Sequence, residues 1–201
     1  MVLPKTLIQR ITDEKLKVFI AGSTWDNDEK IISPVIKEAI SIREKLLAII
    51  VPHEVDAEHI AELKNHFGSD AITLSSIDRY QNEKIIIVDS IGKLFALYRI
   101  ASFAYIGGGF SSGVHNILEP AAWGVPSIVG PNHERSKEIA ALIGLNGAIE
   151  IRTKEEFEDA FANWFANDMA RNLSALAAKD YVFHSAGAKE RIMEKISSIK
   201  W

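Results

Sequence analysis

Short runs of apolar, often β-branched residues alternate along the chain with longer segments in which apolar residues recur every three or four positions. The short runs predict strands at 16–21, 47–51, 71–74, 84–88, 103–106, 127–129 and 148–151. The longer segments predict helices at 28–45, 56–67, 93–99, 116–123, 134–143 and 154–165, then a helical stretch over 168–200 with a break near 184–187. Residues 75–83 are polar and are expected to form a loop. The alternation predicts an α/β fold: a Rossmann-like, doubly wound parallel sheet with C-terminal helices packing back onto it.

Composition narrows the class of protein without changing this prediction. The 201 residues are 47% hydrophobic, enough to bury the core of a single domain spanning 1–201. No apolar run approaches the roughly 18 residues needed to cross a bilayer, and the N-terminus lacks the order of a signal peptide, so we expect a cytoplasmic domain. The net charge of −4, without charge blocks, argues against a nucleic-acid partner. The absence of cysteine excludes disulfides, thiolate metal sites and a cysteine nucleophile.

Five loops that follow predicted strands carry the candidate chemistry. In an open parallel sheet, ligands bind at the carboxyl ends of the strands, so these loops are expected to converge on one edge. They span residues 22–24, 52–54, 90–92, 107–116 and 130–133.

The richest of these loops contains Gly107, Gly108, Gly109 and Gly113. Consecutive glycines after a strand let the backbone approach a ligand closely, and free N–H groups at a following helix start suit a phosphate.

Asn116 and Glu119 follow this loop three residues apart, so both should face the same way on a helix. The Glu119 carboxylate can accept two hydrogen bonds from the vicinal hydroxyls of a ribose. The alternative is a capping box, with Asn116 as the N-cap and Glu119 as its partner. Spacing alone leaves both interpretations open.

The remaining polar candidates have equally open roles. Ser23 and Thr24 either bind substrate or cap the next helix. His53, His115 and His133 are expected to donate hydrogen bonds to a ligand or to the backbone. A metal site is not expected, because no cysteine or clustered aspartate accompanies them. Glu54 is either a ligand contact or an acid favoured at a helix start.

Five aromatic residues on apolar faces of the predicted helices are expected in the core, although an exposed apolar strip among them would instead suit an interface with another domain. These residues are Trp123, Phe157, Phe161, Trp164 and Phe165.

The stretch from Gly107 to Gly124, centred on His115-Asn116-Ile117-Leu118-Glu119-Pro120-Ala121-Ala122, closely resembles the nucleotide-binding motif of the 3-deoxy-D-manno-octulosonic acid (Kdo) transferases of lipopolysaccharide synthesis. The resemblance includes Gly22-Ser23-Thr24, Ser90-Ile91-Gly92-Lys93-Leu94, Gly130-Pro131-Asn132-His133 and Ser185-Ala186-Gly187-Ala188. Ordered motifs over nearly the whole chain make a chance match improbable.

The resemblance implies the C-terminal, donor-binding half of a GT-B glycosyltransferase, whose N-terminal acceptor domain is absent from this chain. It implies binding of CMP-Kdo or CMP, with Glu119 on the ribose, Asn116 and the helix start on the phosphate, and the Ile91–Gly92 backbone near the cytosine. The family's general base comes from the N-terminal domain, so no catalytic residue and no cofactor are expected here.

The parent enzyme implied by this resemblance is an inverting transferase that moves Kdo from CMP-Kdo to a lipid A precursor. It would lie peripherally on the cytoplasmic face of the inner membrane of a Gram-negative bacterium, and this chain alone would be inactive. Two alternatives remain: a UDP-sugar-dependent GT-B transferase or epimerase, and a non-catalytic nucleotide-sugar-binding module.

Two positions depart from the family pattern. Trp25 stands where the family commonly has histidine, and the arginine that commonly precedes the second-strand histidine is missing before His53. Arg135 and Lys137 are the candidates, by loop position, to replace the lost positive charge.

Overall fold

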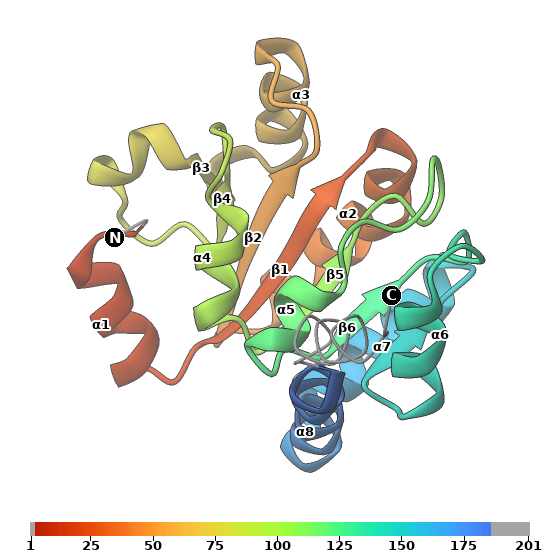
Figure 1. The fold of residues 1–201 in the computed structure, drawn as a ribbon. Coiled ribbons are helices and arrows are strands. Elements are labelled where there is room, and N and C mark those ends of the chain that lie inside the picture. Colours follow the sequence, from red (N-terminus) through yellow and green to blue (C-terminus); the bar gives the residue numbers. More distant parts are fainter. Residues whose placement is uncertain (1–2, 186–201) are drawn as a thin grey trace, which may run out of the picture.

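The computed structural model describes residues 3–185 and contains a seven-stranded, fully parallel sheet in the order β3-β4-β2-β1-β5-β6-β7 (Figure 1). The strands are β1 (Lys17–Thr24), β2 (Leu46–Pro52), β3 (Ala71–Thr73), β4 (Ile85–Ile87), β5 (Phe103–Ile106), β6 (Ser127–Val129) and β7 (Ala148–Glu150). The order reverses direction at β1, as in a doubly wound fold, so the predicted fold class is confirmed.

Helices cover both faces of the sheet (Figure 1). They are α1 (Lys5–Asp13), α2 (Asp26–Ile42), α3 (Ala57–Phe67), α4 (Leu94–Leu97), α5 (Leu118–Ala122), α6 (Lys137–Gly144), α7 (Lys154–Ala166) and α8 (Asp168–Ser185). Alternate residues of β1 point to opposite faces: Val18 and Ile20 pack with α1, α4, α5, α6 and α8, whereas Phe19 and Ala21 pack with α2, α3 and α7.

Aromatic side chains fill the layer between β1, β5 and α7. Phe19 and Phe103 lie with ring centroids 5.1 Å apart, and both contact Phe161. The predicted core positions of Phe157, Phe161 and Trp164 are confirmed, and Phe165 is half-buried against the same cluster.

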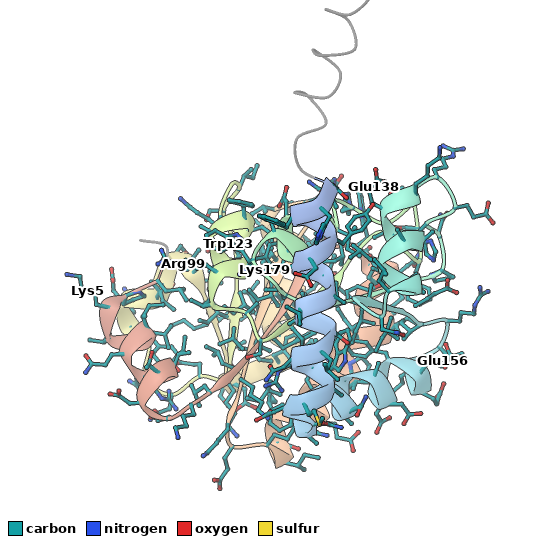
Figure 2. The ribbon with its side chains drawn as sticks, turned by 60° about the horizontal axis from the view of Figure 1, so that its bottom comes forward. Lys5, Arg99, Trp123, Glu138, Glu156 and Lys179 are labelled. Carbon is teal, nitrogen blue, oxygen red and sulfur yellow. The ribbon has the colours of Figure 1, made fainter. Side chains whose placement is uncertain are left out.

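Trp123 was expected in the core, and that prediction is wrong. Its side chain is 42% exposed beside Phe95 on the face shown in Figure 2. Trp123 follows the last residue of the five-residue helix α5, so it does not continue a buried helical face.

Several elements differ from the sequence-based prediction in their presence, type or bounds. Helix α1 was not expected, and part of the expected loop 75–83 is a 3-10 helix at Leu74–Arg79. The expected helices 116–123 and 134–143 begin later, at Leu118 and Lys137.

Helix α8 packs back against α5, α6 and α7, which confirms the expected C-terminal packing up to Ser185. The expected helix end to residue 200 and the motif from Ala186 to Ala188 lie outside the described residues. In the described part of the chain, no helix combines the length and apolarity required to cross a membrane.

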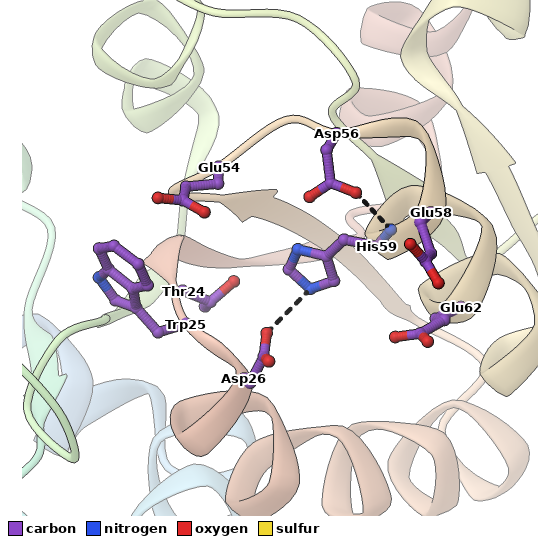
Figure 3. A pocket seen from close by; sticks show the side chains of 8 residues that line it. All are labelled: Thr24, Trp25, Asp26, Glu54, Asp56, Glu58, His59 and Glu62. Carbon is purple, nitrogen blue, oxygen red and sulfur yellow. Dashed lines mark hydrogen bonds and ion pairs between the residues drawn. The ribbon is translucent and has the colours of Figure 1, made fainter.

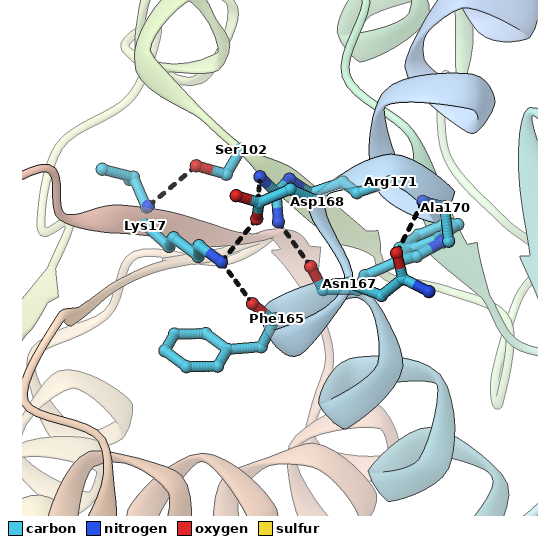
Figure 4. Close-up of polar contacts among 9 residues, drawn as sticks. Lys17, Ser102, Phe165, Asn167, Asp168, Ala170 and Arg171 are labelled. Atoms are coloured by element: carbon cyan, nitrogen blue, oxygen red, sulfur yellow. Dashed lines mark hydrogen bonds and ion pairs between the residues drawn. The ribbon is translucent and has the colours of Figure 1, made fainter.

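A polar junction ties the start of β1 to the turn between α7 and α8 (Figure 4). The Lys17 ammonium donates to the carbonyl of Phe165 at 2.5 Å and to the carboxylate of Asp168 at 2.6 Å. Arg171 also binds Asp168, at 2.8 Å. This junction lies at the amino end of β1, opposite the edge that carries the candidate chemistry.

Candidate functional site

The sheet register brings the candidate loops to one edge. Gly22 of β1 pairs with Ile106 of β5, and Ile106 pairs with Val129 of β6. On the other side, Thr24 pairs with Pro52 of β2, and Ile50 of β2 pairs with Ile87 of β4. All five loops therefore leave the carboxyl edge of the sheet, as the parallel topology requires.

The glycines of the loop 107–113 fit against neighbouring backbone. A Cβ on Gly107 would lie 2.1 Å from the carbonyl oxygen of Ser23, and one on Gly109 would lie 2.5 Å from Cα of Gly130. A Cβ on Gly108 would meet the carbonyl oxygen of Gly113 at 2.1 Å. Gly107, Gly108 and Gly109 therefore allow the loops after β1, β5 and β6 to pack together. Their expected role in bringing the backbone close to a ligand stays a prediction.

Asp28, in the first turn of α2, anchors this loop. Its buried carboxylate accepts hydrogen bonds from the N–H groups of Gly108 at 2.8 Å and Phe110 at 3.3 Å. It also accepts from the Tyr105 hydroxyl at 2.7 Å and from the main-chain N–H of Trp25 at 3.0 Å. Burial, reinforced by the Asp28 charge, raises the pKa of Tyr105 well above its ordinary value.

The role of Asp28 changes the expected chemistry of the loop. The N–H groups of Gly108 and Phe110 already bind a carboxylate, so they are not available to a phosphate. Sequence reasoning missed Asp28, because an acid in the first turn of a helix ordinarily serves its own helix.

Three aromatic rings meet beside the loop. The Trp25 and His53 ring centroids are 4.3 Å apart, and those of His53 and His115 are 4.4 Å apart, with near-parallel planes. The Trp25 indole N–H donates to Nε2 of His115 at 2.9 Å. Burial, followed by the proximity of His53, lowers the pKa of His115. Trp25, which stands where the family commonly has histidine, is thus in direct contact with His53 and His115, two of the expected site histidines.

Asn116 and Glu119 face each other, as expected from their spacing. The Asn116 amide donates to the Glu119 carboxylate at 3.3 Å, and its oxygen accepts from the Leu118 N–H at 3.0 Å. Because α5 begins at Leu118, Asn116 precedes the helix instead of starting it. The Glu119 side chain binds the Asn116 side chain instead of its main-chain N–H, so this is not the capping box considered above. Among the described residues, the N–H groups of Asn116 and Ile117 have no backbone acceptor.

The candidates in the loops 22–24 and 90–92 have contrasting environments. Thr24 is buried, and its hydroxyl donates to Glu29 at 2.7 Å instead of capping α2. Ser23 lies at an irregularity in β1 with φ of 53°. Ile91 is 86% exposed beside Gly92, in an open turn.

His133 does not stack with His53 and His115 but contacts residues after β6 and in β7. Its Nε2 is 2.7 Å from Glu150, which also binds Arg152 at 2.6 Å. Burial of Glu150 opposes ionisation, but these two partners outweigh it and lower the pKa of Glu150. Arg135 lines a cavity of about 480 Å³ with His133 and Gly113, between the Gly-rich loop and the loop after β6. Lys137 is exposed at the start of α6.

A second cavity, of about 220 Å³, lies between the starts of α2 and α3 and is strongly acidic (Figure 3). His59 is surrounded there by carboxylates. Besides His59, the lining residues are Thr24, Trp25, Asp26, Glu54, Asp56, Glu58 and Glu62. Burial lowers the pKa of His59, but the contacts with Glu29, Asp26 and Asp56 outweigh it and raise the pKa.

The ligand atoms of Asp26, Glu29 and His59 lie within 4.8 Å of one another, close enough to surround a cation. His59 Nε2 is already 2.7 Å from Glu29, so a cation there would displace that hydrogen bond. The histidine of this cluster is not one of those that sequence reasoning considered.

Comparison with curated proteins gives relatives that share one name. The chain is 31% identical over 157 residues to a 3-deoxy-D-manno-octulosonic acid transferase of Aquifex aeolicus, covering 76% of this chain and 43% of that protein. It is 33% identical over 148 residues to the Rickettsia bellii protein of the same name, covering 70% and 34%. The chain thus spans less than half the length of these relatives. No family model matches it.

Comparison with solved structures supports the same fold. The C-terminal CMP-Kdo binding domain of WaaA from Acinetobacter baumannii superimposes with a TM-score of 0.78 at 22% identity, covering 88% of this chain and 94% of that domain. The glycosyltransferase WaaG superimposes with a TM-score of 0.61 at 12% identity, covering 98% of this chain and 52% of WaaG. The expected fold of a C-terminal GT-B domain is confirmed.

Proposed function

Because this chain is related in sequence to the Kdo transferases, we propose that it is the donor-binding domain of such an enzyme and binds CMP-Kdo, or the product CMP, at the carboxyl edge of its sheet. The observation that carries the proposal is the sequence relationship, 31% identity over 157 residues. The likeness in fold to a domain described as CMP-Kdo binding supports it. The parent reaction would transfer Kdo from CMP-Kdo to a lipid A precursor.

Glu119 is the proposed ribose contact. It is half-buried next to Asn116, and one hydrogen bond at 3.3 Å leaves carboxylate lone pairs for two ribose hydroxyls. The Asn116 amide orients the carboxylate, which limits the ordering needed when the nucleotide binds.

The proposed phosphate contacts follow from which N–H groups are free. The N–H groups of Asn116 and Ile117 point to no backbone acceptor, in contrast to those of Gly108 and Phe110. When CMP leaves, its phosphate gains negative charge, and fixed N–H donors stabilise that charge without a large reorganisation. Arg135, exposed on the cavity wall after β6, is the proposed source of positive charge in place of the missing arginine.

The exposed turn at Ile91 and Gly92 is the proposed neighbour of the cytosine. Its backbone is open to solvent, and nothing lies within 4 Å of a Cβ built on Gly92. A base can therefore approach the main chain there and form hydrogen bonds that distinguish it from other bases.

The general base and the acceptor site are proposed to belong to an N-terminal domain of the parent protein, held at the cytoplasmic face of the inner membrane. The chain alone is then expected to bind nucleotide without transferring sugar. Fusing the N-terminal half of a related transferase to this chain should restore sugar transfer, and a transfer assay on the fusion tests this.

Isothermal calorimetry with CMP, and with UDP as competitor, tests the binding proposal. We expect CMP to bind and to be preferred over UDP, and Glu119→Gln to weaken CMP binding about tenfold, the effect of removing one charge-assisted hydrogen bond. Glu158→Gln, on an exposed position of α7, is the matched control and should bind as the unaltered protein. Absence of binding at millimolar CMP contradicts the proposal, and preference for UDP supports the UDP-sugar alternative.

A further inference from the structure

The hydrogen bond between Trp25 and His115 fixes where the imidazole carries its proton. The indole N–H can only donate, so Nε2 of His115, at 2.9 Å, must accept. A neutral imidazole with an accepting Nε2 carries its proton on Nδ1. Among the described residues, Nδ1 of His115 has no hydrogen-bond partner, so that N–H is free for a ligand.

The surroundings hold the ring in this orientation. The ring is stacked against His53, and the His115 main-chain N–H donates to the carbonyl of Gly107 at 3.0 Å. Trp25 is itself held, because its main-chain N–H binds Asp28 at 3.0 Å. His115 also lines a cavity of about 270 Å³ with Asn116 and Ile117, the residues that carry the free N–H groups.

We propose that Trp25 is a positioning residue that sets His115 as the neutral tautomer with its proton on Nδ1, and that His115 thereby donates a hydrogen bond to an anionic oxygen of the bound nucleotide. This inference rests on the proposed function. A positioning residue of this kind acts through the His115 imidazole, so the effect of Trp25 on nucleotide binding should depend on the presence of that imidazole.

The same contact opposes protonation of His115. Protonation would place a second N–H on Nε2, facing the indole N–H, and the hydrogen bond would be lost. The other groups that face this imidazole are His53, which also disfavours a positive charge, and Asp28, which favours it. Replacing Trp25 by a residue without an N–H should therefore raise the pKa of His115.

Imidazole nitrogen NMR reads the tautomer directly. In the unaltered chain, with signals assigned by His115→Gln, we expect Nδ1 of His115 to be protonated and Nε2 to be the accepting nitrogen. Trp25→Phe keeps a ring in the stack but removes the N–H, so we expect the Nε2–H tautomer to appear and the pKa of His115 to rise. Trp123→Phe, at an exposed tryptophan elsewhere, is the matched control and should change neither.

CMP titrations over the same pH range test the consequence for binding. We expect Trp25→Phe to weaken CMP binding about threefold to tenfold, as for loss of one hydrogen bond, and to have no further effect in a His115→Gln background.

A protonated Nε2 in the unaltered chain overturns the inference without any variant. An unchanged tautomer in Trp25→Phe, or equal losses with and without His115, also overturns it. If the unaltered chain binds no CMP, the proposed function fails, while the NMR measurement still decides the role of Trp25 toward His115.

Discussion

The carboxylate of Asp28 accepts a hydrogen bond from the main-chain N–H of Gly108, which lies 80 positions away in the sequence, at 2.8 Å. This contact joins the first turn of α2 to the start of the Gly-rich loop. It makes a buried charge part of the framework that shapes the candidate site, and its removal has a calculable cost.

Asp28→Asn should lower the free energy of unfolding by about 3 kcal/mol, because hydrogen bonds to a charged acceptor each contribute about 1.5–3 kcal/mol. One carboxylate oxygen of Asp28 accepts from the main-chain N–H groups of both Gly108 and Trp25. In asparagine a side-chain NH₂ group replaces one carboxylate oxygen, so a donor would face donors there. Urea denaturation measures the loss. Asp159→Asn, an exposed aspartate of α7, should change stability by less than about 0.5 kcal/mol, and equal effects of the two variants would refute the anchoring role.

Gly109→Ala should destabilise the domain by about 2 kcal/mol, since its Cβ would lie 2.5 Å from Cα of Gly130 and two backbones would have to separate. Gly144→Ala is the control: nothing lies within 4 Å of a Cβ there, and alanine should stabilise the end of α6 by a few tenths of a kcal/mol. Thermal denaturation of both variants checks the contrast. If Gly109→Ala were as stable as Gly144→Ala, the close packing of these loops would be wrong.

His59 should make stability depend on pH near neutrality. Its pKa is raised in the folded protein because contacts with Glu29, Asp26 and Asp56 outweigh burial. The proton therefore binds the folded state more tightly, and this stabilisation is fully present below the unfolded pKa of about 6.5 and is lost as pH rises through the raised value. Urea unfolding between about pH 5.5 and about pH 8.5 should show the loss.

The control for this pH dependence is a second histidine of the same helix. His59→Gln should flatten the decline in stability, while His66→Gln, at an exposed position, should leave it intact. A decline that persists in His59→Gln would assign it to other groups.

Lys17→Met should lower the free energy of unfolding by about 1 kcal/mol, because it leaves the Phe165 carbonyl and Asp168 without their ammonium partner. Its effect on CMP affinity should be nil, since this junction lies at the opposite edge of the sheet. Lys154→Met, at an exposed position of α7, should be neutral in both measurements. A change in CMP binding by Lys17→Met would contradict the assignment of the site to the carboxyl edge.

The fold followed closely from the sequence because strand and helix periods differ clearly in this chain. Parallel topology then placed the five loops at one edge. Helix α1 was missed because it precedes the first strand, outside the alternation of strands and helices, and Leu7 is its one buried residue. The exposure of Trp123 could not be foreseen, because it depends on α5 ending after five residues.

The site was harder to predict than the fold. A glycine that approaches a ligand and a glycine that packs against another loop look the same in the sequence, so the packing of Gly107 and Gly109 against neighbouring backbone could not be predicted. The contacts of Asp28 with Gly108, and of Trp25 with His115, join residues far apart in the chain. By contrast, the pairing of Asn116 with Glu119 is local, and its spacing predicted it.

The acidic cavity around His59 has a consequence for how a nucleotide would reach this edge. Carboxylates of Asp26, Glu54, Asp56, Glu58 and Glu62 concentrate negative potential over the α2–α3 side of the sheet. A nucleotide anion would be repelled there, and in the proposed site it would meet Arg135 on the β5–β6 side. The charge distribution thus gives the edge a direction of approach, and because exposed charges are screened by salt, this guidance weakens as ionic strength rises.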